Sequence, residues 1–493
     1  MAGQGNKNLK RNIRPDAPSL LQRVDVLSSK KGSKDSVSLV NGTVRLLYWE
    51  SILADTVSAS LIFTDAGNTM STQKTGQGHG KRKKKVSAVE GLPILGGETV
   101  NLKFTDNKGN TLDFNDKNGS LILNDRPTIP TDSQTSSKSY ELILGSPEFV
   151  AENEKVRVRY PSSEILSEQV KNILEKVLKT KKKIDVEDTK NSMNYIGKNR
   201  KPFYVINDLS KKSVSAGSQE LGFSAGYLFW ETSEGYHFKS IDTILTGEQK
   251  KKIIYNESAD NKIPKGYDIK ALTLETSNRV NVQKKYQMGA YCTRSIEINP
   301  YDTNFKSTIT NAFDPKVQEK LNLSGGYFAP ENDAFTKEGA DAQFSRTTYY
   351  TADVGQQHIS ADKENTEEQI EKSKEENFKK SEVVNQSIMR YNQLFASQIT
   401  ITIPGDFSLH AGDCVWMDIP EISESENKAC GDDVNKVDGG LYTIADLCHY
   451  ITAKQTYTKL NLIRDSFGRV KGQSSTNDQA SKVMDANFLP YIK

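Results

Sequence analysis

The sequence predicts a mainly β fold with α+β insertions, built around two related antiparallel β-barrel domains. Three observations lead to this prediction. Near the C-terminus apolar residues alternate with polar ones, as at Ile399, Ile401 and Ile403, which is typical of a strand with one buried face. Short runs of this kind are separated by Gly, Pro and Asp turns, a pattern typical of a small barrel or sandwich. The third observation is a turn-and-strand pattern that occurs twice.

The repeated pattern is a glycine followed by an acid and then by apolar residues at every second position. It runs GETVNLKF from Gly97 and Glu98, and GDCVWMDI from Gly412 and Asp413. A Gly-acid pair before a strand is ordinary turn chemistry. The recurrence therefore indicates either chance or two related β domains in one chain.

Length and composition favour a soluble multidomain protein. At 493 residues the chain has room for about two to four domains, each with its own core. Charged residues make up 26% of the chain, yet the formal net charge is only +3, so there is no global signal for polyanion binding. Four cysteines argue against a disulfide scaffold and favour synthesis in a reducing cytoplasm. No apolar run reaches the length of a membrane span, and the N-terminus lacks a secretory pattern.

The first third of the chain is predicted to hold a basic arm and then a barrel. Residues 1–34 are basic and poor in large apolar groups, which indicates either a flexible arm or one that orders on a neighbouring subunit. Inside the barrel, residues 68–85 form a polar loop that ends in KRKKK. Its glycine spacing does not fit a P-loop. We interpret it as a solvated hairpin tip, with contact to DNA phosphates or an acidic partner as the alternative.

The middle of the chain mixes helical and strand patterns. Apolar residues at helical spacing between Leu166 and Val177 predict a helix. The aromatic runs 203–206 and 227–230 predict strands. Residues 303–395 look inserted, because the run 360–380 is charged on all sides. Such a run is either a helix that crosses solvent or partly disordered.

The resulting domain organisation has eight segments. They are a flexible N-terminal arm (1–34), a first barrel (35–150, completed by about 218–250), an α+β insertion (151–217), a linker and β segment (251–284), the start of a second barrel (285–310), a helical and charged insertion (311–395), the rest of the second barrel (396–467) and a C-terminal tail (468–493).

No constellation of residues in the sequence indicates an enzyme. The zinc-protease pattern HExxH, the nucleophile elbow GxSxG and the dinucleotide fingerprint are all missing from the sequence. Cys414, Cys430, Cys448 and His449 indicate either a zinc site or small core residues, and the core is favoured because neighbouring strand residues point to opposite faces. We therefore expect a non-catalytic protein without cofactor or metal.

Two stretches carry a resemblance to a known family. They are the aromatic run 222–238 and the turn pair from Ile403 to Asp413, with Pro404 and Gly405 at its first turn. With the repeated Gly-acid pattern, they resemble the baseplate central hub proteins of contractile-tailed, T-even-type bacteriophages. The resemblance extends over roughly residues 40–465 as a pattern of elements. The 68–85 loop and the 303–395 insertion depart from it.

The resemblance implies a virion protein of the tail baseplate. It implies a homotrimer in which each chain gives two tube-type barrels, so that a threefold central spike can meet a sixfold tail tube. The implied partners are the central spike, tail tube initiator proteins, the tape measure protein and baseplate wedge proteins. DNA would pass through the channel without specific binding. The alternative is a β-rich tail protein that degrades peptidoglycan or binds cell wall.

The resemblance also assigns roles to particular residues. Those expected to build the barrel turns without contacting a ligand are Gly97, Glu98, Pro404, Gly405, Gly412 and Asp413. At the C-terminus an apolar cluster ends a polar tail, and it indicates either a docking peptide for a partner or a strap onto its own subunit. The cluster consists of Phe488, Leu489, Tyr491 and Ile492.

Overall fold

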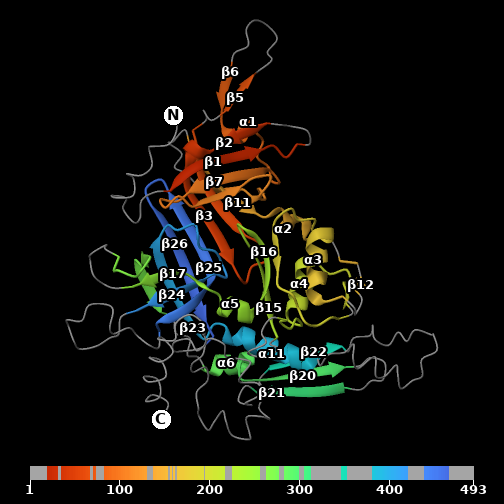
Figure 1. The fold of residues 1–493 in the computed structure, drawn as a ribbon. Coiled ribbons are helices and arrows are strands. Elements are labelled where there is room, and N and C mark those ends of the chain that lie inside the picture. The colour runs from red at the N-terminus through yellow and green to blue at the C-terminus, as the bar shows by residue number, and fades with distance from the viewer. Residues whose placement is uncertain are drawn as a thin grey trace, which may run out of the picture.

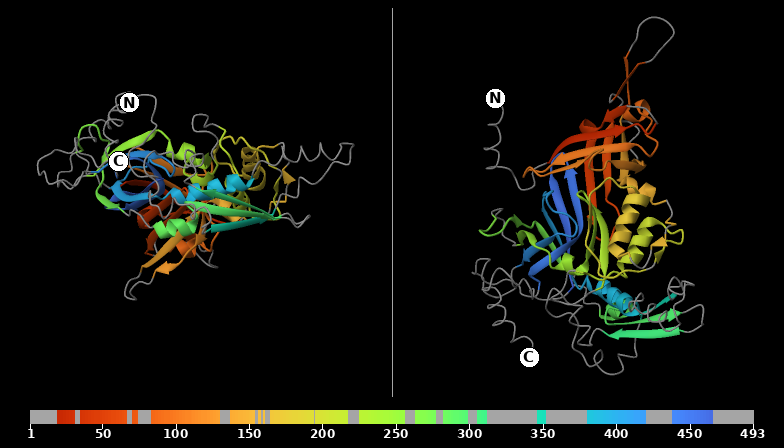
Figure 2. Two further views of the ribbon diagram at one scale, coloured as in Figure 1. Left: turned by 90° about the horizontal axis from the view of Figure 1, so that it is seen from below. Right: turned by 45° about the vertical axis from the view of Figure 1, so that its right-hand side comes forward.

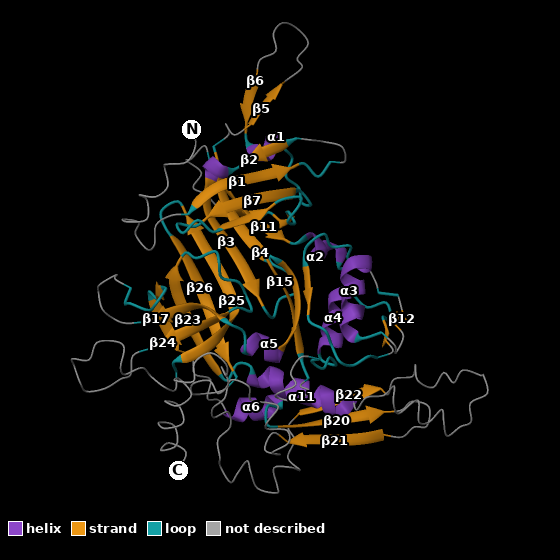
Figure 3. Cartoon of the chain, in the orientation of Figure 1, coloured by secondary structure: helices purple, strands orange, loops and turns teal. Residues whose placement is uncertain are grey.

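The structure is a computed structural model, and it is mainly β with large mixed sheets. It describes residues 19–30, 35–66, 70–73, 83–129, 137–153, 156–157, 159–160, 164–193, 195–216, 225–255, 263–276, 282–298, 305–311, 346–351, 380–419 and 438–465. The strands of the two barrels occupy the centre, and helices lie beside and beneath them (Figures 1 and 3). In this part of the chain no helix has both the length and the apolar character needed to span a membrane.

The first barrel is a ring of strands from the N-terminal third. Around it β1 pairs with β7, β7 with β9, β9 with β11, β11 with β4, and β4 with β3. On its other edge β1 pairs with β2, which leads through η2 (Val40–Gly42) into β3 and so completes the ring. Its strands are β1 (Leu20–Leu27), β2 (Ser36–Ser38), β3 (Thr43–Ser51), β4 (Ser58–Asp65), β7 (Thr99–Thr105), β8 (Thr111–Phe114), β9 (Leu121–Asp125), β10 (Thr128–Ile129) and β11 (Lys138–Gly145).

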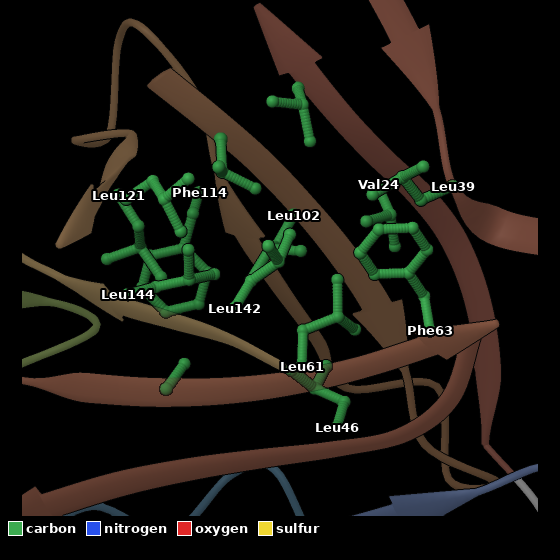
Figure 4. Packing of buried hydrophobic residues seen from close by; sticks show 14 of the residues in the cluster. Val24, Leu39, Leu46, Leu61, Phe63, Leu102, Phe114, Leu121, Leu142 and Leu144 are labelled. Carbon is green, nitrogen blue, oxygen red and sulfur yellow. The ribbon is translucent and has the colours of Figure 1, made fainter. Parts of the chain in front are cut away.

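One apolar core fills this barrel. Alternate residues of β7 (Val100, Leu102 and Phe104) are fully buried in it, as the period of two predicts. Figure 4 shows Leu102 and Leu142 turned toward the same interior. Each such side chain contributes about 1.5–3 kcal/mol by leaving water. The hairpin of β5 (Met70–Gln73) and β6 (Lys83–Val86) projects from the end of the barrel near α1 (Ala88–Gly91) (Figure 1).

The α+β insertion packs beside the two barrels with its own core. In its sheet, β16 pairs antiparallel with β15 and parallel with β13. The predicted helix begins at Leu166 and continues into a π-helical turn. The elements are α2 (Pro147–Ala151), β12 (Arg159–Tyr160), α3 (Leu166–Asn172), η3 (Ile173–Val177), β13 (Ile184–Val186), β14 (Tyr195–Ile196), α4 (Pro202–Ser210), β15 (Tyr227–Thr232), β16 (Gly235–Ser240) and α5 (Ile241–Leu245).

The second barrel is formed mainly by the C-terminal strands. Around it β17 pairs with β24, β24 with β25, β25 with β26, β26 with β23, and β23 with β19. The ring is completed because β18 pairs with β17 and leads directly into β19. Its strands are β17 (Gln249–Ile254), β18 (Ile269–Lys270), β19 (Thr273–Thr276), β23 (Ser397–Pro404), β24 (Cys414–Asp418), β25 (Gly440–Thr452) and β26 (Thr456–Arg464).

The two rings have the same strand order. In chain order β1, β2, β3, β4, β7, β9 and β11 of the first correspond to β17, β18, β19, β23, β24, β25 and β26 of the second. One difference is the direction of β17, which is parallel to its neighbours β18 and β24, whereas β1 is antiparallel to β2 and β7. The barrels join edge to edge, because β25 also pairs with β3. This order confirms the expectation of two related β domains.

A third unit lies at the far end of the molecule from the β5–β6 hairpin (Figure 2). Helix α11 (Lys380–Gln393) packs against a sheet in which β20 (Cys292–Ile298) is flanked by β21 (Phe305–Asn311) and β22 (Arg346–Thr351). On α11, Asn385 Nδ2 donates hydrogen bonds to Thr308 O at 3.2 Å and to Thr310 Oγ1 at 3.0 Å. Helix α6 (Val282–Met288) precedes this sheet.

Four expectations from the sequence differ from the structure. Residues 20–27 form β1 rather than part of a flexible arm, because Val24 and Val26 reach the core. Residues 227–240 form β15 and β16, which pair with each other and, through β16, with β13, and they do not complete the first barrel. Residues 292–298 form the separate sheet under α11, so the second barrel starts at β17. The run 203–206 lies in helix α4, where Pro202 occupies the first turn and favours helix initiation.

Candidate functional site

The first predicted turn, at Gly97 and Glu98, enters strand β7. Gly97 has a φ of +81°, a left-handed conformation that glycine adopts without steric cost. The buried carboxylate of Glu98 accepts hydrogen bonds from Leu95 N at 2.9 Å and Gly96 N at 2.8 Å. It thereby satisfies two backbone donors that the turn leaves without strand partners.

The second predicted turn, at Gly412 and Asp413, enters strand β24 in the same way. Gly412 has a φ of +91°, and the Asp413 carboxylate accepts a hydrogen bond from His410 N at 2.8 Å. Burial raises the pKa of Asp413, while the charge of Lys250, 2.8 Å away, acts in the opposite direction.

The two turns share one backbone hydrogen-bond pattern. Gly97 N donates to Leu123 O at 2.8 Å, and Leu123 N donates back to Glu98 O at 2.9 Å. Correspondingly, Gly412 N donates to Ile444 O at 2.8 Å, and Ile444 N donates to Asp413 O at 2.9 Å. The repeated sequence pattern therefore marks equivalent positions of the two rings.

The turn at Pro404 and Gly405 connects the two barrels. Pro404 ends β23, and a Cβ added at Gly405 would lie 2.5 Å from Thr456 Cγ2, so the close approach favours glycine. The next two residues reach the first barrel. Lys108 Nζ lies 2.7 Å from Asp406 Oδ2, and Phe407 inserts its ring into the core of the first barrel.

The C-terminal cluster of Phe488, Leu489, Tyr491 and Ile492 lies outside the described residues. The tip of the 68–85 loop and most of the 303–395 insertion also lie outside them. The docking hypothesis for the cluster therefore stays a prediction.

The two turn glycines provide a matched pair for a stability test. Substituting either with alanine places a Cβ at positive φ, which costs about 1–2 kcal/mol. The new Cβ of Gly412→Ala would also lie 2.6 Å from Trp230 Cζ2, whereas that of Gly97→Ala meets nothing within 4 Å. We expect Gly412→Ala to lose about 1–3 kcal/mol more than Gly97→Ala. Urea unfolding of both variants measures this, and equal losses would contradict the proposed contact.

A buried polar junction, which the sequence analysis did not predict, ties the barrels to the insertion. It contains Glu50 from β3, Glu231 from β15, His410 from the second barrel and Lys182 from the insertion. The signal was present as two copies of an aromatic-Trp-Glu-hydroxyl pattern, YWES at 48–51 and FWET at 229–232. Each glutamate accepts a hydrogen bond from the turn that follows the other one's strand. Ser233 N donates to Glu50 at 2.9 Å, and Val57 N donates to Glu231 at 2.9 Å.

Glu50 is held in its charged form at this junction. Its carboxylate accepts hydrogen bonds from Tyr48 Oη at 2.8 Å and Ala411 N at 3.0 Å, and His410 Nδ1 lies 3.3 Å away. Burial alone would raise the pKa of Glu50, but the charge and hydrogen bond of His410, together with the backbone donors, lower it to about 2. In turn, Glu50 raises the pKa of His410 against the opposite effect of burial.

The other half of the junction is a cation between two carboxylates. Lys182 Nζ lies 2.8 Å from Glu148 Oε2 and also contacts Glu231 Oε1. Ser146 Oγ donates to Glu231 Oε2 at 2.5 Å. Burial raises the pKa of Glu231, and the neighbouring charge of Glu148 acts in the same direction. The arrangement is a structural ion-pair network, because all of these groups are buried.

The junction does not present its acids to a substrate. Glu50 and Glu231 are each 2% exposed, and His410 is 6% exposed. Their oxygens already accept hydrogen bonds from backbone and side chains. Within the described ranges, no group of three or more His, Cys, Asp or Glu side chains is placed to hold a metal ion.

Comparison with known proteins finds similarity of fold to tail proteins. No protein-family model and no curated protein matches the chain. Among solved structures, a 43 kDa tail protein of prophage MuSo2 from Shewanella oneidensis is 9% identical, with a TM-score of 0.47 over 90% of this chain and 99% of that one. A tail protein from Neisseria meningitidis is 9% identical, with a TM-score of 0.46 over 90% and 96%.

The fold also resembles tail-like secretion components. An E. coli component of the type VI secretion system, described as similar in structure to T4 bacteriophage tail proteins, is 9% identical, with a TM-score of 0.40 over 91% of this chain and 80% of that one. The neighbours are thus phage tail proteins and related secretion proteins. At 9% identity the likeness is one of fold alone.

Proposed function

We propose that this chain is a structural virion protein of a phage tail, and that three copies form the baseplate hub. The observation that carries the proposal is the internal repeat, in which two rings share one order of seven strands and one hydrogen-bond pattern at their Gly-acid turns. Three chains with two similar rings each would present six similar units. Such an assembly can join a threefold spike to a sixfold tube.

The interior of the chain suits a rigid adapter. The rings share a continuous sheet through β3 and β25, and Phe407 of the second barrel packs in the core of the first. Fixed relative placement of the two rings is what a quasi-sixfold ring requires, since a closed symmetric assembly tolerates little variation between its interfaces. The proposed partners are the central spike, tail tube initiator proteins, the tape measure protein and baseplate wedge proteins, with DNA passing through the channel without specific binding.

The proposed role is not enzymatic. The acids of the junction, Glu50 and Glu231, are buried and hydrogen-bonded there, whereas a glycosidase needs two carboxyl groups that flank a substrate. A peptidoglycan-degrading protein would lyse cells and lose that activity on a single acid substitution.

The oligomeric state tests the hub directly. Light scattering across a dilution series is expected to give a mass near three times the 55.0 kDa of the chain. A variant destabilised at the Lys182 junction is measured alongside as a control for misfolded aggregates. Such aggregates have no fixed mass, whereas a trimer keeps one mass. A monomer at all concentrations that also clears peptidoglycan would overturn the hub.

A further inference from the structure

An open groove lies where the α+β insertion meets helix α11 and strand β22. It encloses about 910 Å³, within the range of pockets that bind ligands. Buried apolar side chains, including Leu228, Val384 and Ile388, form its floor. We call it the tyrosine groove because six tyrosines line it: Tyr195, Tyr204, Tyr227, Tyr349, Tyr350 and Tyr391.

The lips of the tyrosine groove are exposed and apolar. Tyr204 on α4 is 54% exposed and Tyr349 on β22 is 67% exposed, although both side chains are large. Leu53 and Ile196 line the groove and are also exposed. Large exposed apolar groups that converge on one concave surface are typical of an interaction site rather than of scattered surface residues.

The groove carries an excess of positive charge. Its only acidic lining residue within the described part of the chain is Asp208. The Asp208 carboxylate forms an ion pair with Lys212 Nζ at 2.6 Å and accepts a hydrogen bond from Tyr195 Oη at 3.2 Å. The other basic side chains that line the groove are Lys198, Arg200, Lys211 and Arg346. Clustered cations with one paired acid create a field that attracts an acidic ligand.

The side-chain amides at the groove are already hydrogen-bonded within the protein. Asn207 Nδ2 donates to Asp55 Oδ1 at 2.8 Å. Asn392 Nδ2 donates to Met288 O at 2.6 Å and to Ile388 O at 2.9 Å. The amide donors and the carboxylate of Asp208 are therefore engaged within the protein, whereas recognition of sugar hydroxyls needs such groups to be available.

We propose that the tyrosine groove binds an extended acidic polypeptide segment of a partner protein. Apolar side chains of the segment would pack on the floor between the tyrosines, and its carboxylates would face Arg200, Lys211 and Arg346. Aromatic residues and Arg are the side chains enriched where proteins bind each other. The proposal goes beyond the hub function and requires neither the trimer nor the spike.

The test measures peptide binding to the full-length protein by fluorescence anisotropy. The probe is a short fluorescein-labelled peptide of alternating glutamate and leucine, and the matched control peptide carries glutamine in place of glutamate. We expect the glutamate peptide to bind on the order of tenfold more tightly and its affinity to fall as salt is raised.

Charge-reversal variants locate the site. The double variant Arg200→Glu with Lys211→Glu is expected to weaken binding on the order of tenfold, and Tyr349→Ala is expected to weaken it by a similar factor. The matched control is Lys117→Glu with Lys176→Glu. It makes the same change in net charge at two exposed lysines outside the groove. All four basic positions are exposed, so these variants should fold.

Several outcomes would overturn the proposal. Equal weakening by both double variants would mean that only net charge matters. Equal binding of the two peptides, or binding of an N-acetylglucosamine oligomer instead, would assign the groove to another ligand. If groove variants change the oligomeric mass, the occupant is a second copy of this chain. Binding that appears only after deletion of residues 352–379 would mean that the chain occupies its own groove.

Discussion

Lys182→Met is expected to lower the free energy of unfolding by about 3–5 kcal/mol. Lys182 is almost fully buried between the carboxylates of Glu148 and Glu231, whose side chains are 6% and 1% exposed. Its charge offsets the burial of both acids and lowers the pKa of Glu148, which burial alone would raise. Methionine keeps the length of the side chain but leaves two acids without a cation, so the loss comes from charge rather than from a cavity.

The matched control is Lys171→Met. Lys171 pairs with Glu168 at 2.7 Å, but both side chains are about one-third exposed or more, and such pairs contribute at most about 1 kcal/mol. Adding Glu231→Gln to Lys182→Met should restore part of the stability, because it removes one of the unpaired charges. Urea unfolding measures all three variants. Similar losses for Lys171→Met and Lys182→Met would show that the junction is not a desolvated network.

The barrels were predictable because their signals are local. Ile399, Ile401 and Ile403 alternate along β23, and all three are fully buried, as a half-buried strand requires. The Gly-acid turns were also predictable, since a residue at positive φ and a carboxylate that accepts backbone N–H groups leave a recognisable pair in the sequence. The sequence could therefore indicate the repeat but not the ring in which each strand lies.

What the sequence could not predict depends on contacts between distant segments. The strand β17 carries the run KKK at 250–252, which hides its alternation, and its place in the second barrel depends on parallel pairing with β24. The exchange between Glu50 and Glu231 joins residues more than 170 positions apart. A Trp-Glu pair in a strand indicates a half-buried position, and only the folded structure shows that each glutamate accepts a hydrogen bond from the turn beside the other.

Acidification from about pH 6.5 to about pH 3 is expected to destabilise the protein by up to about 5 kcal/mol through His449 alone, at ~1.36 kcal/mol per pH unit. Burial lowers the pKa of His449 from 6.5 to about 3, and the charge of His410 acts in the same direction while that of Glu50 opposes it. Between these two pKa values the unfolded chain therefore binds a proton at His449 that the folded chain does not bind. The stability that neutral His449 contributes is full above pH 6.5 and is lost as the pH falls toward 3.

The neighbouring pair of Glu50 and His410 limits the pH range in which the effect of His449 can be measured alone. The lowered pKa of Glu50, about 2 instead of 4.5, contributes stability that is present above pH 4.5 and is lost as the pH falls toward 2. The raised pKa of His410 contributes stability that is full below pH 6.5 and is lost as the pH rises above it. Between pH 4.5 and 6.5, His449 is the one of these three groups that changes its contribution.

Replacing the imidazole isolates this effect. His449 packs against Tyr48 and Phe407, with ring centroids 6.0 and 4.6 Å away, so His449→Phe fills a similar space with an aromatic ring. The lost hydrogen bond to Thr458 Oγ1, now 2.9 Å, lowers stability by the same amount at every pH. The variant should therefore lose less stability than the original protein between pH 6.5 and 4.5. Parallel curves for His449→Phe and the original protein would mean that His449 is not buried in its neutral form.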